Sequence, residues 1–254
     1  MLREFKYDFK ESGRGEPVIM LHGMFGDISN WDGVLKEVSK YFRAIALNLP
    51  YLDFEPGLCS VGVMTEFLAR FIESQNLNDV TLIGNSLGGH VALDYVINYK
   101  ERIKRLVLTG SSGLFERGYT DDIQIHPTRE YLSRKIGEIF YDKRFVTDKM
   151  VDEAYATLKS RMLKLKIVRI SKSAKRYNLS GQLPLISCNT MLIWGKNDII
   201  TPPEVAHIFK SGIRNSRLVF INGCGHAPMM EKPDEFNRYL INFLNNSGNV
   251  KKYH

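Results

Sequence analysis

Residues 82–93 place a serine among closely spaced glycines. The apolar run over residues 80–83 ends at Gly84, Ser86 follows, and Gly88-Gly89 precede an apolar pattern of helical spacing. The pattern G-x-S-x-G between a strand and a helix is typical of a nucleophile elbow. Small neighbours let the helix and the strand approach while the backbone of the serine is held in a strained conformation. We therefore predict that Ser86 is a nucleophile.

A serine hydroxyl is a weak nucleophile unless a base takes its proton, and the base needs a carboxylate to fix its tautomer. Asp198 and His226 each follow an apolar run, over residues 191–194 and 218–221 respectively. Catalytic groups of a parallel sheet gather at the carboxyl ends of its strands. We therefore predict a catalytic triad of Ser86, Asp198 and His226, in that chain order.

Other residues could fill two of these roles. Asp53 or Asp79 could be the acid, but the first lies in a loop and the second precedes its strand, so both are poorly placed. Cys224 lies two residues before His226 and could be a nucleophile, although a structural thiol is the favoured interpretation.

Acyl transfer also needs two backbone N–H groups for the developing oxyanion. Leu87, directly after the nucleophile, is one candidate, and Met24 in the loop over residues 22–26 is the other. Phe25 and Met229 flank these loops, so we expect them to line a substrate pocket, with ordinary apolar packing as the alternative.

The elements around these residues alternate between strands and helices. Apolar or alternating runs predict seven strands, over residues 5–9, 18–21, 44–49, 80–83, 105–109, 191–194 and 218–221. Helical spacing predicts helices over residues 31–42, 60–72, 203–209 and 233–244, besides the one after the elbow. This alternation indicates an α/β fold, a mostly parallel sheet of about seven to eight strands flanked by helices.

One segment interrupts the alternation. Between Leu114 and Leu185 no apolar strand run occurs, and the helix-like stretches are residues 130–140 and 147–170. About seventy residues are too many for a loop. We therefore expect a core of residues 1–113 and 188–254, with residues 114–187 inserted as a helical cap.

The whole chain sets further limits. It has 254 residues, of which 44% are hydrophobic and 25% charged, as in globular proteins. The charged start does not resemble a signal peptide, no apolar run is long enough to span a membrane, and three scattered cysteines suggest a reducing compartment. We expect a cytoplasmic protein without metal or cofactor.

The net charge of +7 is concentrated in the segment 114–185, where 15 lysines and arginines face nine acidic residues. Eight basic residues and no acidic one lie within residues 155–177. A solvated helix face is one interpretation, and a positive rim that attracts acidic substrates is the other. No nucleic-acid-binding motif accompanies the charge, so we expect a small-molecule substrate and no nucleic acid.

Four motifs together give the chain a specific resemblance. It resembles the capped α/β-hydrolases over residues 16–244. The motifs are His22-Gly23-Met24-Phe25-Gly26, Gly84-Asn85-Ser86-Leu87-Gly88-Gly89, Trp194-Gly195-Lys196-Asn197-Asp198 and Gly225-His226-Ala227-Pro228. The resemblance implies up to eight strands; the seven found here suggest that the first family strand is absent and that residues 5–9 form the antiparallel second. Asn48 stands where relatives often have aspartate, a difference that we interpret as structural.

The resemblance implies a serine hydrolase, and carboxylic ester hydrolysis through an acyl-enzyme is the expected reaction. The elbow is also similar to that of the meta-cleavage-product hydrolases, which cleave carbon–carbon bonds. Those enzymes usually have tryptophan after the histidine, where this chain has Ala227. Acyl transfer to another acceptor and a non-catalytic ligand receptor remain alternatives.

Overall fold

In the computed structural model, which describes residues 5–115 and 127–245, seven strands form one sheet in the order β1-β3-β2-β4-β5-β6-β7. Strand β1 is antiparallel to β3, and the remaining neighbours are parallel. The strands are β1 Phe9–Ser12, β2 Pro17–Leu21, β3 Arg43–Leu47, β4 Val80–Asn85, β5 Ile103–Thr109, β6 Asn189–Gly195 and β7 Ser216–Ile221. The predicted α/β fold with a mostly parallel sheet is confirmed.

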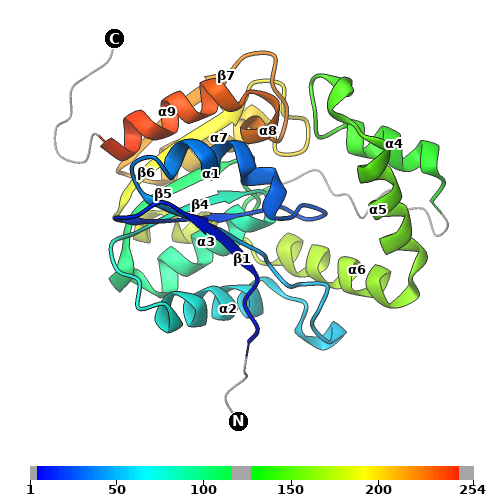
Figure 1. Cartoon of the computed structure of the whole chain (residues 1–254), viewed down its shortest axis with the longest axis horizontal. Coiled ribbons are helices and arrows are strands. Elements are labelled where there is room, and N and C mark those ends of the chain that lie inside the picture. The colour runs from blue at the N-terminus through cyan, green and yellow to red at the C-terminus, as the bar shows by residue number, and fades with distance from the viewer. Residues whose placement is uncertain (1–4, 116–126, 246–254) are drawn as a thin grey trace.

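Helices cover both faces of this sheet (Figure 1). On β2, Ile19 and Leu21 contribute to one buried cluster and Val18 and Met20 to the other, as expected when successive side chains point to opposite faces. Helices α2, α3 and α7 bury their apolar residues in the first cluster, and α1 and α9 in the second. Their bounds are α1 Asp32–Val38, α2 Val61–Ser74, α3 Leu87–Asn98, α7 Pro203–Gly212 and α9 Pro233–Asn245.

Short helical elements lie in the connections. These are η1 Ile28–Trp31, η2 Pro56–Leu58, η3 Lys100–Arg102, η4 Lys143–Phe145, η5 Ser180–Leu185 and α8 Pro228–Glu231. Ser60 caps α2, and its side chain accepts a hydrogen bond of 3.3 Å from the N–H of Val63.

The first strand lies later in the chain than predicted. The alternation over residues 5–9 predicts a strand there, but β1 begins at Phe9. The rings of Phe5 and Tyr7 contact phenylalanines of α2, so their alternation reflects packing on a helix rather than strand pairing. Directly after β1, Gly13 has a φ of 83°, which favours glycine. The antiparallel role in the sheet therefore belongs to residues 9–12.

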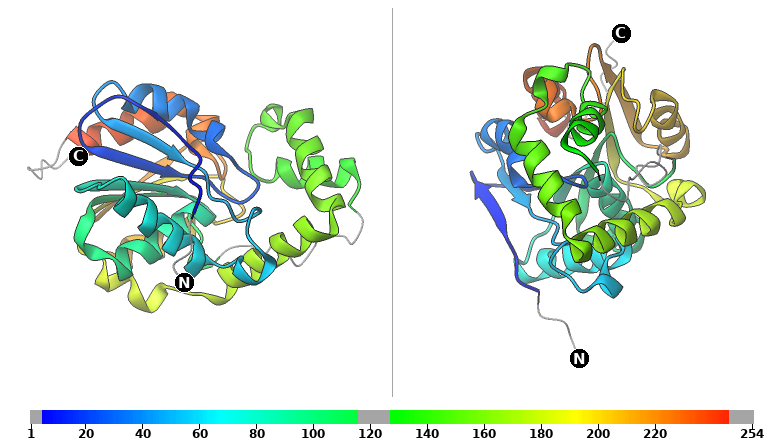
Figure 2. Two further views of the ribbon diagram at one scale, coloured as in Figure 1. Left: turned by 60° about the horizontal axis from the view of Figure 1, so that its bottom comes forward. Right: turned by 90° about the vertical axis from the view of Figure 1, so that its right-hand side faces the viewer.

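Between β5 and β6, every regular element that the described residues form is helical. The longer ones are α4 Arg129–Gly137, α5 Asp148–Lys159 and α6 Arg161–Arg176, together called the inserted helices below, with η4 between the first two and η5 after the third. They lie beyond one end of the sheet (Figure 2). The stretch 147–170, expected to be continuously helical, is divided at Ser160, which has an extended backbone and caps α6. Within the described ranges, no helix has the length and apolar character to cross a membrane.

Candidate active site

Ser86 lies at the apex of the turn between β4 and α3. Its φ of 53° and ψ of −119° are unfavourable for a residue with a side chain, so the surrounding structure must hold it there. A Cβ at Gly84 would lie 2.5 Å from Gly89, and one at Gly88 would lie 2.3 Å from the carbonyl oxygen of Leu21. Neither glycine tolerates a side chain. The motif thus encodes the close approach that exposes the serine.

His226 and Asp198 form a buried pair at the ends of β7 and β6. The Nδ1 atom of His226 lies 2.9 Å from Oδ2 of Asp198, and both residues are at most 4% exposed. Asp198 also accepts hydrogen bonds from the N–H groups of Ile200 and Thr201 and from the Thr201 hydroxyl. These donors fix the carboxylate, which in turn holds the imidazole in one orientation.

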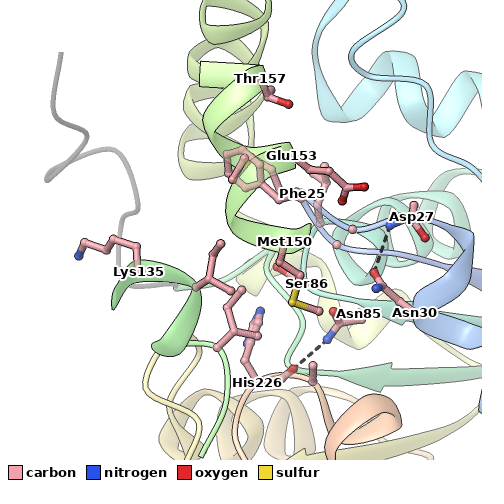
Figure 3. A pocket seen from close by; sticks show the side chains of 18 of the residues that line it. Phe25, Asp27, Asn30, Asn85, Ser86, Lys135, Met150, Glu153, Thr157 and His226 are labelled. Atoms are coloured by element: carbon pink, nitrogen blue, oxygen red, sulfur yellow. Dashed lines mark hydrogen bonds between the residues drawn. The ribbon is translucent and has the colours of Figure 1, made fainter. Parts of the chain in front are cut away.

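Asn85, whose role sequence reasoning missed, connects the serine to the histidine. Its Nδ2 donates hydrogen bonds of 3.0 Å to the carbonyl oxygens of Thr109 and His226, and Figure 3 shows the second of these. The side chain next to the nucleophile therefore links β5 to residues 222–227, the loop between β7 and α8 that carries His226, called the histidine loop below. Its position before Ser86 in the elbow motif was the available signal.

Two backbone N–H groups beside Ser86 point to no acceptor. Within the described residues, the N–H groups of Met24 and Leu87 make no hydrogen bond, and both residues line the same pocket as Ser86. A Cβ on Gly23 would lie 3.0 Å from the Ser86 Cβ, so this loop passes directly by the serine. Unpaired N–H groups in this place are what an oxyanion hole requires.

His22 supports that loop and is not placed as a base. Its Nδ1 donates to the carbonyl oxygen of Gly23 at 2.8 Å, and its Nε2 accepts from the N–H of Leu49 at 2.9 Å. Burial lowers the pKa of His22, so the ring stays neutral as these bonds require. Phe25 follows with a φ of 61°, and its N–H donates to the Tyr51 hydroxyl.

A cavity of about 380 Å³ opens between the strand ends and the inserted helices. From the core, its wall includes Ser86, His226, Met24, Phe25, Leu87 and Met229. From the inserted helices, apolar residues predominate, among them Leu132, Ile136, Met150, Leu158, Ile167 and Ile170. Figure 3 shows Met150, Glu153 and Thr157 along α5. Both expected pocket residues, Phe25 and Met229, thus line a cavity that reaches Ser86.

The eight lysines and arginines between residues 155 and 177 are not part of the cavity wall. Helix α6 turns Ile167, Ile170 and Ala174 towards the cavity, which leaves its basic face on the other side. The charged residues of the wall are instead Asp27, Lys135, Lys149 and Glu153. The geometry therefore favours a solvated helix face over a positive rim.

The alternative candidates Asp53, Asp79 and Cys224 are not placed to act as the acid or the nucleophile. Asp79 lies in the turn before β4, at the end of that strand opposite Ser86. Asp198, and not Asp53, is the carboxylate bonded to His226. Burial raises the pKa of Cys224, so its thiol stays protonated and a poor nucleophile. Among the residues described, no three histidine, cysteine or acidic side chains cluster as metal ligands.

Comparisons with known proteins agree with this geometry. The model of the alpha/beta hydrolase fold family matches residues 16–233. MGS-MChE2, an alpha/beta hydrolase enzyme from a sediment metagenome of the lagoon of Mar Chica, is 36% identical; the match covers 96% of this chain and 97% of that one, with a TM-score of 0.79.

Two curated relatives are named as hydrolases of unsaturated 2-hydroxy-6-oxo acids. The 2-hydroxy-6-oxo-6-phenylhexa-2,4-dienoate hydrolase of Comamonas testosteroni is 26% identical, with 96% of this chain and 92% of that protein covered. The 2-hydroxy-6-oxononadienedioate/2-hydroxy-6-oxononatrienedioate hydrolase 1 of Pseudomonas putida is 28% identical, with 93% and 90% covered. The family match spans most of the chain, and the fold and the elbow agree with it: the protein belongs to the alpha/beta hydrolases.

Proposed function

We propose that this hydrolase cleaves carboxylic esters of small molecules through an acyl-enzyme on Ser86. The observation that carries the proposal is the juxtaposition at one cavity of a strained serine, a buried histidine–aspartate pair and two unpaired N–H groups. A serine esterase needs each of these parts.

In this mechanism, His226 takes the proton of the Ser86 hydroxyl as its oxygen attacks the ester carbonyl. The carbonyl oxygen becomes an oxyanion, which the N–H groups of Met24 and Leu87 stabilise. His226 then gives its proton to the leaving alcohol, and an acyl-Ser86 remains. Water, deprotonated by His226, attacks the acyl group; His226 then returns the proton to the Ser86 oxygen as the bond to the acyl group breaks and the acid is released. Asp198 orients the imidazole and stabilises its charged form throughout.

The cavity supports a small, largely apolar acyl group. Its volume is in the range of small-molecule sites, and most residues that the inserted helices contribute are apolar. We propose that residues 114–187 act as a cap that closes this space. A substrate with a carboxylate would meet Lys135 or Lys149 in the wall rather than the basic face of α6.

Carbon–carbon bond hydrolysis is the second candidate. It is favoured by the curated relatives, whose names state that they act on dienoates and whose similarity extends over 90% or more of both chains. Against it, Ala227 follows the histidine, where tryptophan is usual in those enzymes. Ester hydrolysis remains the proposal because the triad and the oxyanion site suffice for it.

A panel of substrates distinguishes the two candidates. We would measure kcat/KM for p-nitrophenyl esters of increasing acyl length beside a 2-hydroxy-6-oxohexa-2,4-dienoate, with Ser86→Ala as the control. The proposal expects the highest value for a short or medium ester and a loss of about a millionfold in the alanine variant. A higher kcat/KM for the dienoate would favour the second candidate, and Ser86-independent turnover would contradict both.

A further inference from the structure

Glu231 is a buried carboxylate that the proposed mechanism does not use. It is 5% exposed and ends the short helix α8, five residues after His226. Its Oε2 accepts a hydrogen bond of 2.7 Å from the N–H of Gly225, and its Oε1 accepts one of 2.6 Å from the N–H of Asp142. One carboxylate thus joins the histidine loop to the segment that follows α4.

A third hydrogen bond connects the same two segments. The N–H of His226 donates to the carbonyl oxygen of Ile139 at 2.7 Å. A Cβ on Gly225 would lie 2.5 Å from that carbonyl oxygen and 2.9 Å from the Tyr141 nitrogen, so no side chain fits between them. Residues 139–142 are therefore packed directly against the backbone that carries the imidazole.

This arrangement requires a carboxylate rather than an isosteric amide. Two N–H donors point at two acceptor oxygens, and hydrogen bonds of N–H groups to a charged acceptor are stronger than neutral ones. A glutamine would present an NH₂ group to one of these donors, and one buried N–H would lose its acceptor. The loop would then have to move to relieve the conflict.

We propose that Glu231 is a positioning residue, which holds the histidine loop against residues 139–142 so that the inserted helices and the imidazole are placed together. The inference rests on the proposed function, because it assigns His226 as the base. Residues 139 and 140 also line the cavity. A displacement of this segment would therefore change the orientation of His226 as well as the cavity wall.

The direct test is Glu231→Gln, with Glu235→Gln as the matched control. Glu235→Gln makes the same chemical change four residues away. The Glu235 side chain is 37% exposed, and its ion-pair partner among the described residues is Arg238, at 3.7 Å. Active sites are counted by end-point labelling with a fluorophosphonate, and kcat per labelled site and KM are measured with an ester. We expect kcat per site to fall about a hundredfold in Glu231→Gln, as for a misplaced catalytic group, with little change in KM.

A purely structural role gives a different result. It would reduce the number of labelled sites or the melting temperature while kcat per labelled site stays at the wild-type value, and that outcome overturns the inference. If Ser86→Ala retained activity, the proposed function itself would fail. If turnover required Ser86 but kcat per labelled site was unchanged in Glu231→Gln, only the positioning role would be contradicted.

A second pair of variants keeps the test decisive where Glu231→Gln yields no labelled sites. Asp142→Pro removes the N–H that Glu231 binds; the φ of −89° at this position has the sign that a proline ring requires and lies about 10° beyond its usual range. Asp142→Ala removes the same side chain but keeps the N–H. We expect a lower kcat per labelled site in the proline variant than in the alanine variant. Equal values would contradict a link through Glu231.

Discussion

The strand ends and the inserted helices contribute to the same cavity in different ways. At the strand ends, backbone geometry fixes each group: Ser86 has a positive φ, and Asp198 has four donors around its carboxylate. From the inserted helices, mainly apolar side chains reach the cavity; α4 packs mainly on α5, whereas α6 packs on α5 and also on α2 and η2 of the core.

We infer from this difference that the strand ends determine the reaction and the inserted helices determine which substrates fit. Hydrogen-bonded groups at strand ends can hold reacting atoms within the narrow geometry that catalysis needs. Apolar walls carried by amphipathic helices set the shape and volume available to a substrate but supply no reacting group. Changes at the strand ends should therefore affect turnover of every substrate, whereas changes in the inserted helices should affect the choice among substrates.

The largest effect should come from the acid at the end of β6. Asp198→Asn favours the wrong tautomer of His226, so we expect kcat to fall by about ten thousandfold for long and short esters alike. Asp53→Asn and Asp79→Asn are the controls and should leave kcat near the wild-type value. Steady-state kinetics with two esters measures this. A large loss in either control, or a loss confined to one ester, would break the comparison.

The strand ends were predictable from the sequence because their signals are local. Apolar runs bounded by glycine define the strands, and Ser86, Asp198 and His226 each follow one of them. The backbone passes so close to Gly84 and Gly88 that only glycine fits at either position, and this requirement is visible in the sequence as the elbow motif.

The inserted helices were less predictable because their signals depend on tertiary contacts. Ser160 divides a stretch with continuous helical periodicity, and no local pattern distinguishes a helix interior from a cap at that position. The bridge at Glu231 joins residues far apart in the sequence. Likewise, the rings of Phe5 and Tyr7 alternate as a strand would but pack on α2.

The junction between the two regions should respond to pH. His90 of α3 stacks on Tyr177, the residue directly after α6, and burial lowers the pKa of His90 to about 4. The unfolded chain binds a proton at this histidine below about pH 6.5, whereas the folded state stays neutral until about pH 4. Folding stability is therefore lost as the pH falls through this window, by up to about 3 kcal/mol.

His90→Phe removes the titrating group and keeps an aromatic ring for the stacking. Urea unfolding at pH 7, 5 and 4 should show a smaller loss of stability in this variant than in the wild type. His207→Phe, at an exposed histidine of α7, is the control and should keep the wild-type pH dependence. An identical pH dependence in His90→Phe would show that other groups cause the acid sensitivity.

A smaller effect, confined to substrate choice, should follow from filling the cavity. Ala154 of α5 is buried and lines it, whereas Ala156 on the same helix is exposed. Ala154→Leu should reduce kcat/KM for long-chain esters by roughly tenfold and leave an acetyl ester little changed, because added methylenes in a pocket discriminate by about this amount. Ala156→Leu is the matched control. Equal losses for both esters would contradict a role in specificity alone.

The smallest effect should come from the basic face of α6. Arg161, Arg169 and Lys172 are exposed, have no ion-pair partner among the described residues and do not line the cavity. Reversing them to glutamate should leave kcat/KM nearly unchanged, and a carboxylate-bearing ester and a neutral one should show parallel curves between 0.1 and 1 M salt. Suppose instead that kcat/KM of the charged ester fell more steeply with salt than that of the neutral ester, and that the reversed variant showed no such difference. The electric field of the basic face, which salt screens, would then attract the substrate.

The most direct test of the central claim is to locate the covalent adduct. The cavity wall also contains Ser29, Ser112 and Ser171, so labelling of the cavity alone does not identify the nucleophile. Ser112 is next to Ser86, and its N–H donates to the Ser86 carbonyl oxygen at 3.1 Å. Peptide mass spectrometry after fluorophosphonate treatment should place one adduct on Ser86 in the wild type and in Ser112→Ala, and none in Ser86→Ala. An adduct on Ser112, or undiminished labelling of Ser86→Ala, would contradict the account.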